Sequence, residues 1–151
     1  MLSNGGVPIA HVGDFGHGVG RLLFQDAVGP DTRVLYAQGC HLYKDRTSGL
    51  AQADDRISET KAVCAAADVI VAVVGLDATI EGEEGDAGNE YGSGDKPNLH
   101  LPGLQQHLLE TAASFGKPLI VITLAGSALA LDWAEEHAAA VVHGSYPGAL
   151  G

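Results

Sequence analysis

The apolar stretch VIVAVVG, residues 69–75, decides the fold of this chain. It carries no charge and does not alternate with polar residues, which is typical of a strand in a parallel sheet covered by helices on both faces. Two similar runs, RVLYA at 33–37 and PLIVITL at 118–124, predict two more buried strands. AAVVHGS at 139–145 predicts a fourth strand, and VPIAHVG at 7–13 predicts a weaker one.

Helical patterns lie between these runs, in LAQADDRISETKAVCAAAD (50–68), GLQQHLLETAASFG (103–116) and LDWAEEHA (131–138). The order of strands and helices predicts an α/β fold, a three-layer α/β sandwich with a mainly parallel sheet, formed by residues 1–151 as a single domain. We expect the core of this domain to include Val69, Val71, Val73, Ile120, Ile122 and Val141.

Composition argues against several classes of protein. The net charge of −11, with only 8 Lys and Arg residues, argues against a nucleic-acid partner, which needs cations to displace counterions. No apolar run approaches the roughly 20 residues of a membrane span, so we expect no membrane partner. The start, MLSNGGVPIAHVG, shows no signal peptide, which favours a cytoplasmic location.

Cys64 is expected in the core, and Cys40 fits either the core or the lining of a cleft.

The sequence motifs favour neither a nucleotide site nor a metal site. GDFGHGVG (13–20) begins a GxGxxG pattern at Gly16 and Gly18, but Arg21 stands where the last glycine should be. Seven histidines include no HExxH or His–Cys cluster. We therefore expect a glycine-rich loop without a nucleotide, and neither a metal nor another cofactor.

The segment 76–102 is the strongest functional signal. It follows the strand 69–75, at the end of the sheet where α/β proteins bind ligands, and it is far longer than a usual loop of about 2–6 residues. Seven acidic residues lie between Asp77 and Asp95. A glycosidic or ester oxygen leaves readily only when a carboxylic acid protonates it, and IEGEEGD (80–86) offers such acids. A solvated surface loop is the competing interpretation.

The order of several motifs resembles the C-terminal α/β domain of glycoside hydrolase family 3, the family of β-glucosidases and β-xylosidases. These motifs are VLYAQGC (34–40), AADVIVAVVGLDATIEGEE (66–84), GDKPNLHLPGLQQHLLE (94–110), GKPLIVITLAGSALALDWA (116–134) and YPG (146–148). The resemblance implies a hydrolase of O-glycosyl bonds with a retaining mechanism shared between two domains. It further implies that the nucleophile Asp belongs to an N-terminal (β/α)₈ barrel, which is the expected partner domain, and that the substrate is a β-linked glucoside or xyloside.

The same resemblance assigns residues. Glu83 closes the family's E-G-E pattern and matches the acid/base glutamate, and Glu84 is the second choice. Glu81, Asp95 and Lys96 are implied as weaker substrate-binding candidates.

This chain also departs from the family. It carries no barrel, and it stops just after YPG, so that the domain is expected to be incomplete at its C-terminus. We therefore expect the isolated chain to be inactive. A non-catalytic carbohydrate-binding or interaction module derived from the same domain is the alternative.

Overall fold

The computed structural model describes residues 7–13, 26–45, 49–50, 56–81 and 96–145. Its strands and helices, in chain order, are β1 (Val7–Val12), β2 (Thr32–Ala37), β3 (Lys44–Asp45), β4 (Gly49–Leu50), α2 (Ile57–Ala66), β5 (Val69–Gly75), α3 (Ala78–Glu81), α4 (Gln105–Ala113), β6 (Leu119–Leu124), α5 (Asp132–His137) and β7 (Ala140–Gly144). Within this part of the chain, no helix is long and apolar enough to cross a membrane.

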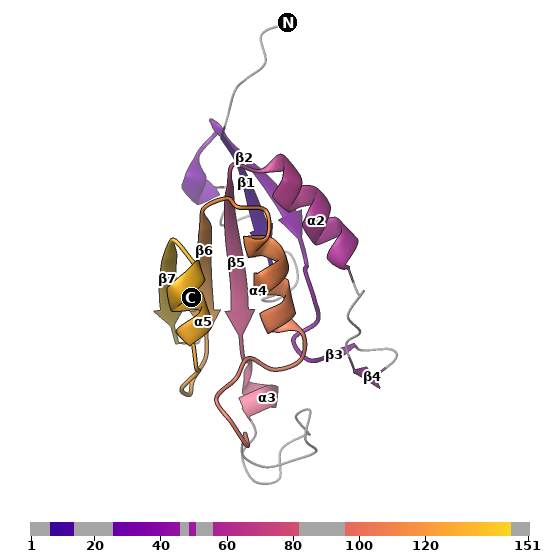
Figure 1. Ribbon diagram of the computed structural model, residues 1–151, viewed down its shortest axis with the longest axis vertical. Helices are drawn as coiled ribbons and strands as arrows, with labels where there is room; N and C mark the ends of the chain where they lie inside the picture. The colour runs from indigo at the N-terminus through magenta and orange to yellow at the C-terminus, as the bar shows by residue number, and fades with distance from the viewer. Residues whose placement is uncertain (1–6, 14–25, 46–48, 51–55, 82–95, 146–151) are drawn as a thin grey trace, which may run out of the picture.

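Five parallel strands form the central sheet in the order β2-β1-β5-β6-β7 (Figure 1). All four strands predicted with most support are present. The weaker candidate, β1, lies inside the sheet between β2 and β5. The α/β sandwich with a parallel sheet is therefore confirmed. Leu50, expected at the start of a helix, instead belongs to the small antiparallel pair β3–β4, and the helix begins at Ile57.

The described helices α2, α4 and α5 lie in front of the sheet in Figure 1 and pack against one of its faces. Side chains of these helices share a cluster with alternate residues of the strands, including Ala10, Val12, Ile70, Ala72, Val74, Leu119 and Val121. All seven of these strand side chains are buried. This cluster is the main core of the domain.

The predicted core list was therefore only partly right. Val71 is buried, but Val69, Val73, Ile120, Ile122 and Val141 are only half-buried. The physical reason is the two-residue period of a strand, which sends neighbouring side chains to opposite faces of the sheet. Val69, Val73, Ile120 and Ile122 lie on the same face of the sheet as Val71, the face away from helices α2, α4 and α5. Val141 lies on the other face, in the edge strand β7. A run of uniformly apolar residues does not show which of the two faces is the better covered.

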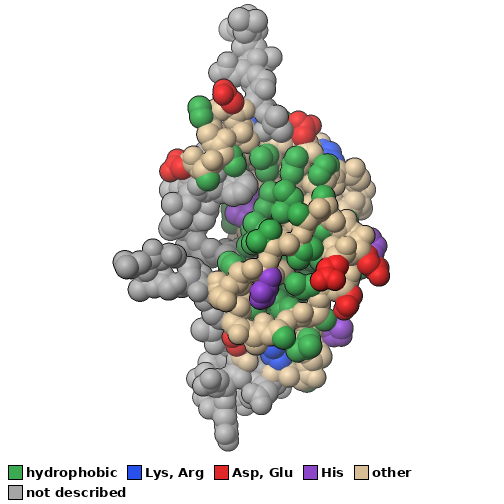
Figure 2. All heavy atoms as spheres, turned by 90° about the vertical axis from the view of Figure 1, so that its left-hand side faces the viewer, with side chains coloured by type: hydrophobic (Ala, Val, Ile, Leu, Met, Phe, Trp, Pro, Cys, Tyr) green, Lys and Arg blue, Asp and Glu red, His purple; other side chains and the backbone are tan. Residues whose placement is uncertain are grey.

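Strand β7 forms an edge of the described sheet, bonded only to β6 among the described strands. Its Val142 side chain is 51% exposed. Figure 2 shows hydrophobic side chains over the upper and central part of this side of the molecule, with acidic side chains gathered at the right. Helix α5 carries three exposed acidic residues, Asp132, Glu135 and Glu136.

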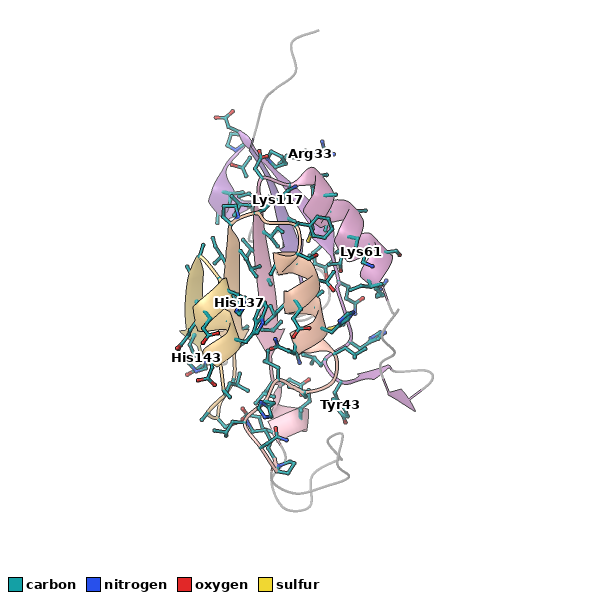
Figure 3. All side chains as sticks on the ribbon, in the orientation of Figure 1. Arg33, Tyr43, Lys61, Lys117, His137 and His143 are labelled. Carbon is teal, nitrogen blue, oxygen red and sulfur yellow. The ribbon has the colours of Figure 1, made fainter. Side chains whose placement is uncertain are left out.

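Lys117 lies at the upper end of the sheet in Figure 3, opposite α3. Its Nζ donates to the carbonyl oxygens of Cys64 and Ala65 at 2.7 Å each, and also to that of Ala67. These are carbonyls at the end of α2, whose own last turn has no basic residue. A cation at the carboxyl end of a helix donates hydrogen bonds to the unpaired carbonyls and interacts favourably with the negative end of the helix dipole.

Candidate functional site at the carboxyl edge of the sheet

The candidate site lies where the parallel strands end. Because β5, β6 and β7 run in the same direction, the segments that follow them meet at one edge, the lower end of the sheet in Figure 1. The long acidic segment begins there after β5. The described structure includes its first residues, up to Glu81, and its last residues, from Lys96 onward.

The exit of the chain from β5 is fixed at Gly75. This glycine has φ 137°, and a Cβ at this position would lie 2.0 Å from the carbonyl oxygen of Leu124. Only glycine allows so close an approach between the two strand ends. The next residue, Leu76, donates its N–H to the same Leu124 oxygen at 2.8 Å, so that the two strands stay paired one residue beyond β5.

The buried side chain of Gln105, at the start of α4, holds the same exit. Its Oε1 accepts the Gly75 N–H at 2.6 Å, and its Nε2 donates to the Gly75 carbonyl at 2.8 Å and to the Leu42 carbonyl at 3.0 Å. One amide thereby satisfies three backbone groups, two of them at the last residue of β5. Sequence reasoning missed Gln105, because a Gln in the first turn of a helix normally indicates a solvated position.

The short helix α3 follows at once. Asp77 caps it, since the Asp77 Oδ1 accepts the Ile80 N–H at 3.1 Å and its carbonyl accepts the N–H groups of Ile80 and Glu81. Leu76 and Ile80 are buried in a second, smaller cluster with Tyr43 and Ala125. Figure 3 shows Tyr43 beside α3. The cap and this cluster together set the direction in which Glu81 leaves the helix.

Glu81 contacts the turn that follows β6. Its Oε1 accepts the N–H of Gly126 at 2.7 Å, the N–H of Ser127 at 2.9 Å and the hydroxyl of Ser127 at 3.1 Å. Two successive backbone N–H groups around one carboxylate oxygen form a small anion-binding nest. The carboxylate implied as a substrate contact is therefore bonded to the protein's own backbone.

Lys96 contacts the same turn from the other end of the acidic segment. Its Nζ donates to the Ala128 carbonyl at 3.0 Å. Shortly afterwards the Ala130 N–H donates to the Leu99 carbonyl at 2.8 Å, which pairs the two segments through their backbones. The structure thus brings Glu81 and Lys96 together at Gly126–Ala128. The other three site candidates, Glu83, Glu84 and Asp95, lie outside the described residues.

The turn Gly126–Ala128 was not among the predicted site residues. Its only sequence signal was a pair of small residues, Gly126 and Ser127, directly after a buried strand. Such residues let another segment approach the backbone closely, but the same pattern also occurs in any tight turn.

The crevice between the ends of β1 and β5, where the strand order reverses, is the usual ligand site of such sheets. Among the described residues, Gln105, Leu108 and Cys40 line a small hollow there. Gly13 lies beside it, and a Cβ on this residue would lie 1.9 Å from the Val73 carbonyl oxygen. Close strand packing therefore explains this first glycine of GDFGHGVG, and the remaining residues of that motif, 14–20, are outside the described part.

The two cysteines differ in their surroundings. Burial raises the pKa of Cys64 to about 11, and the charge of Lys117 acts in the opposite direction. Cys64 belongs to the core, as predicted, and its buried thiol is not activated as a nucleophile. Cys40 meets both of its predicted alternatives, since it is buried and also lines the hollow.

The described histidines do not gather into a metal site. His11 is buried in the sheet with its ring edge against Tyr36, 5.3 Å between centroids, and burial lowers its pKa. His143, at the end of β7, shares a 2.8 Å hydrogen bond between its Nδ1 and the Thr123 hydroxyl. Among the described residues, no three His, Cys, Asp or Glu side chains lie together as metal ligands would.

Comparisons with known proteins agree with this architecture. The family model described as the glycosyl hydrolase family 3 C-terminal domain matches residues 9–151. A probable exo-1,4-β-xylosidase of Aspergillus terreus is 31% identical over 123 residues, and a periplasmic β-glucosidase of Salmonella typhimurium is 27% identical over 144 residues. These matches cover 80% and 84% of this chain but only 14% and 17% of the two relatives.

Solved structures give the same result for the fold. A family 3 exo-β-xylosidase in complex with a xylobiose aziridine probe superimposes with a TM-score of 0.67 at 24% identity. A β-glucosidase from Erythrobacter marinus superimposes with a TM-score of 0.68 at 21% identity. Each comparison covers 98% of this chain, and 19% and 23% of the respective neighbours.

Proposed function

Because this chain belongs to the glycosyl hydrolase family 3 C-terminal domain family, we propose that it supplies the acid/base glutamate, Glu83, of a retaining β-glycosidase. The observation that carries this proposal is the bond of Glu81 to the Gly126–Ser127 turn. It holds the chain at the carboxyl edge of the sheet two residues before Glu83. Glu84 remains the second choice for the acid.

The chemistry needs two carboxyl groups. In the first step Glu83 donates its proton to the glycosidic oxygen as the bond from that oxygen to the sugar C1 breaks, while an Asp carboxylate forms a new bond to C1. In the second step the Glu83 carboxylate takes a proton from the water that displaces the Asp. The two carboxyl groups of such enzymes lie about 5–5.5 Å apart. The Asp belongs to a (β/α)₈ barrel in this proposal, and no cofactor takes part.

The substrate class follows from the relatives. Those matched here are named β-xylosidases and β-glucosidases, so we infer a β-linked xyloside or glucoside for the whole enzyme. The chain spans about one seventh of the xylosidase relatives it matches. Since only one of the two carboxyl groups is proposed to lie on this chain, the chain alone is expected to be inactive.

The proposal is tested by joining this chain to a (β/α)₈ barrel of the family, a protein called the two-domain enzyme below. The chain alone, the barrel alone and the two-domain enzyme are assayed on unactivated β-linked disaccharides of xylose and of glucose. Turnover only by the two-domain enzyme, lost on Glu83→Ala, supports the proposal. Sugar binding by the chain alone, together with a two-domain enzyme indifferent to both Glu83→Ala and Glu84→Ala, would favour the non-catalytic module.

A further inference from the structure

We propose that Glu81 and Lys96 are positioning residues, which hold the two ends of the acid-bearing segment 82–95 against a single turn, Gly126–Ala128. The inference rests on the proposed role of Glu83, which lies within that segment. It replaces the substrate-binding role implied for Glu81 and Lys96 with one that acts through the backbone of the turn.

The first support is the convergence of both contacts on three consecutive residues. Glu81 is the last residue of α3, and its Oε1 accepts the N–H groups of Gly126 and Ser127. Lys96 returns to the neighbouring Ala128 and donates to its carbonyl. Glu81 and Lys96, the residues that flank segment 82–95, are therefore bonded to one place on the domain.

The second support is the match of charge to backbone polarity. The anionic side chain of Glu81 faces backbone donors, and the cationic side chain of Lys96 faces a backbone acceptor. Hydrogen bonds with one charged partner are roughly twice as strong as neutral ones. Exchanging the two charges would place each against a group that repels it.

The third support is the fixed position of the turn itself. Ala125, directly before it, is 2% exposed and packs with Leu76 and Ile80. The Ala125 N–H donates to the Gly144 carbonyl at 3.1 Å, and Leu129, after the turn, packs against the same cluster. The turn is thus bound on both sides to the sheet and its second core.

Such anchoring has a definite catalytic consequence. A general acid acts only within hydrogen-bond reach of the oxygen that it protonates. A displacement of about 1 Å in a catalytic group can lower the rate roughly 100-fold. Fixing both ends of the segment restricts where Glu83 can lie, so that release of either end should lower proton donation more than substrate binding.

The anchor is tested first in this chain without any assay of activity. Amide hydrogen exchange is measured at Gly126 and Ser127 in the unsubstituted chain, in Glu81→Ala and in Ser127→Ala. Exchange at both amides should accelerate at least about tenfold in Glu81→Ala. It should change less in Ser127→Ala, which keeps both backbone donors. The Ala125 amide, bonded to Gly144, is the internal control. Unchanged exchange at Gly126 and Ser127 would overturn the anchor whatever the role of Glu83.

The catalytic consequence is tested in the two-domain enzyme with Glu81→Ala, Glu81→Gln and Lys96→Met. For Glu81→Ala, kcat on unactivated disaccharides should fall roughly 10–100-fold with KM nearly unchanged. The first step on aryl glycosides with acidic leaving groups, followed as the initial burst of released phenol, should be largely spared. Glu81→Gln, which keeps an acceptor oxygen, should retain more activity. Glu110→Ala, on the exposed face of α4, is the matched control.

Each contrary outcome has its own meaning. A raised KM with kcat unchanged would overturn the positioning role and restore direct substrate binding by Glu81. An equal loss in the first step on aryl glycosides would also overturn it, because it would indicate a general structural defect. If exchange at Gly126 and Ser127 responds to Glu81→Ala while neither Glu83→Ala nor Glu84→Ala lowers turnover, the proposed function fails and the anchor itself stands.

Discussion

The side-chain amide of Gln105 pairs with both backbone groups of Gly75, the last residue of β5. The two residues are 30 positions apart, and the acidic segment lies between them. The Gln105 amide therefore joins the start of α4 to the end of β5, and it bonds the N–H and the carbonyl of Gly75 as the backbone of a neighbouring strand would. This pairing closes the base of the loop that carries the proposed acid.

Replacing Gln105 with Leu should lower the free energy of unfolding by roughly 2–4 kcal/mol, since buried groups of Gly75 and Leu42 lose their partner. Urea unfolding measures the change. Gln106→Leu is the matched control, because the neighbouring Gln106 side chain donates to the exposed Glu110, and this substitution should cost at most about 0.5 kcal/mol. Equal losses for the two variants would contradict the role of Gln105.

Ile70→Ala should destabilise the chain by roughly 2–5 kcal/mol, because its fully buried side chain packs beneath the helices. Ile120→Ala should cost only about 1–2 kcal/mol, since Ile120 is half-buried on the opposite face. Both residues are isoleucines in neighbouring strands, so the difference between their losses of stability reports how well each face of the sheet is covered. A larger loss for Ile120→Ala would show that the second face is the better covered one.

Cys64 should resist alkylation in the folded chain. Its pKa of about 11 leaves little thiolate at pH 8, and its side chain is 0% exposed. Iodoacetamide should therefore react at least about 100-fold more slowly at Cys64 in the folded chain than in urea. Peptide mass spectrometry after timed quenching measures both rates. Rapid labelling of Cys64 without denaturant would show that this part of the core opens readily.

His11 should make the chain less stable at mildly acidic pH. Burial lowers its pKa in the folded state, so below pH about 6.5 the unfolded chain binds a proton that the folded chain resists. The unfolding free energy should therefore fall as the pH decreases from 7.5 to 5.5. His11→Gln should reduce this dependence, as measured by urea unfolding at both pH values. An unaltered pH dependence in that variant would assign the effect to other groups.

Glu83→Ala in the two-domain enzyme should lower turnover of unactivated disaccharides by roughly 10²–10⁴-fold, the usual contribution of a general acid. Aryl glycosides with acidic leaving groups need no protonation, so their first step should be nearly spared. Added azide should then rescue the second step, because an anion attacks the glycosyl-enzyme without a general base. If Glu84→Ala instead shows this pattern and Glu83→Ala does not, the acid is Glu84.

The sequence by itself determined the class of the fold. Uniform apolar runs such as 69–75 and 118–124 carry the signal of buried parallel strands, and the helical segments between them dictate crossover connections. Even the weak pattern at 7–13 predicts a strand that the structure contains as β1, because local pattern and strand propensity suffice for such elements. The order of motifs also indicated the family that the comparisons then showed.

Only the tertiary structure decided which face of the sheet forms the main core and which groups fix the acidic segment. Ile70 is buried and Ile120 is only half-buried because the described helices pack on the face that bears Ile70. A uniformly apolar strand does not indicate on which face helices will pack. The bonds of Glu81 and Lys96 to Gly126–Ala128 join residues 32 or more positions apart. Contacts over such separations arise only when parallel strands bring their ends to the same edge, which no local pattern of residues encodes.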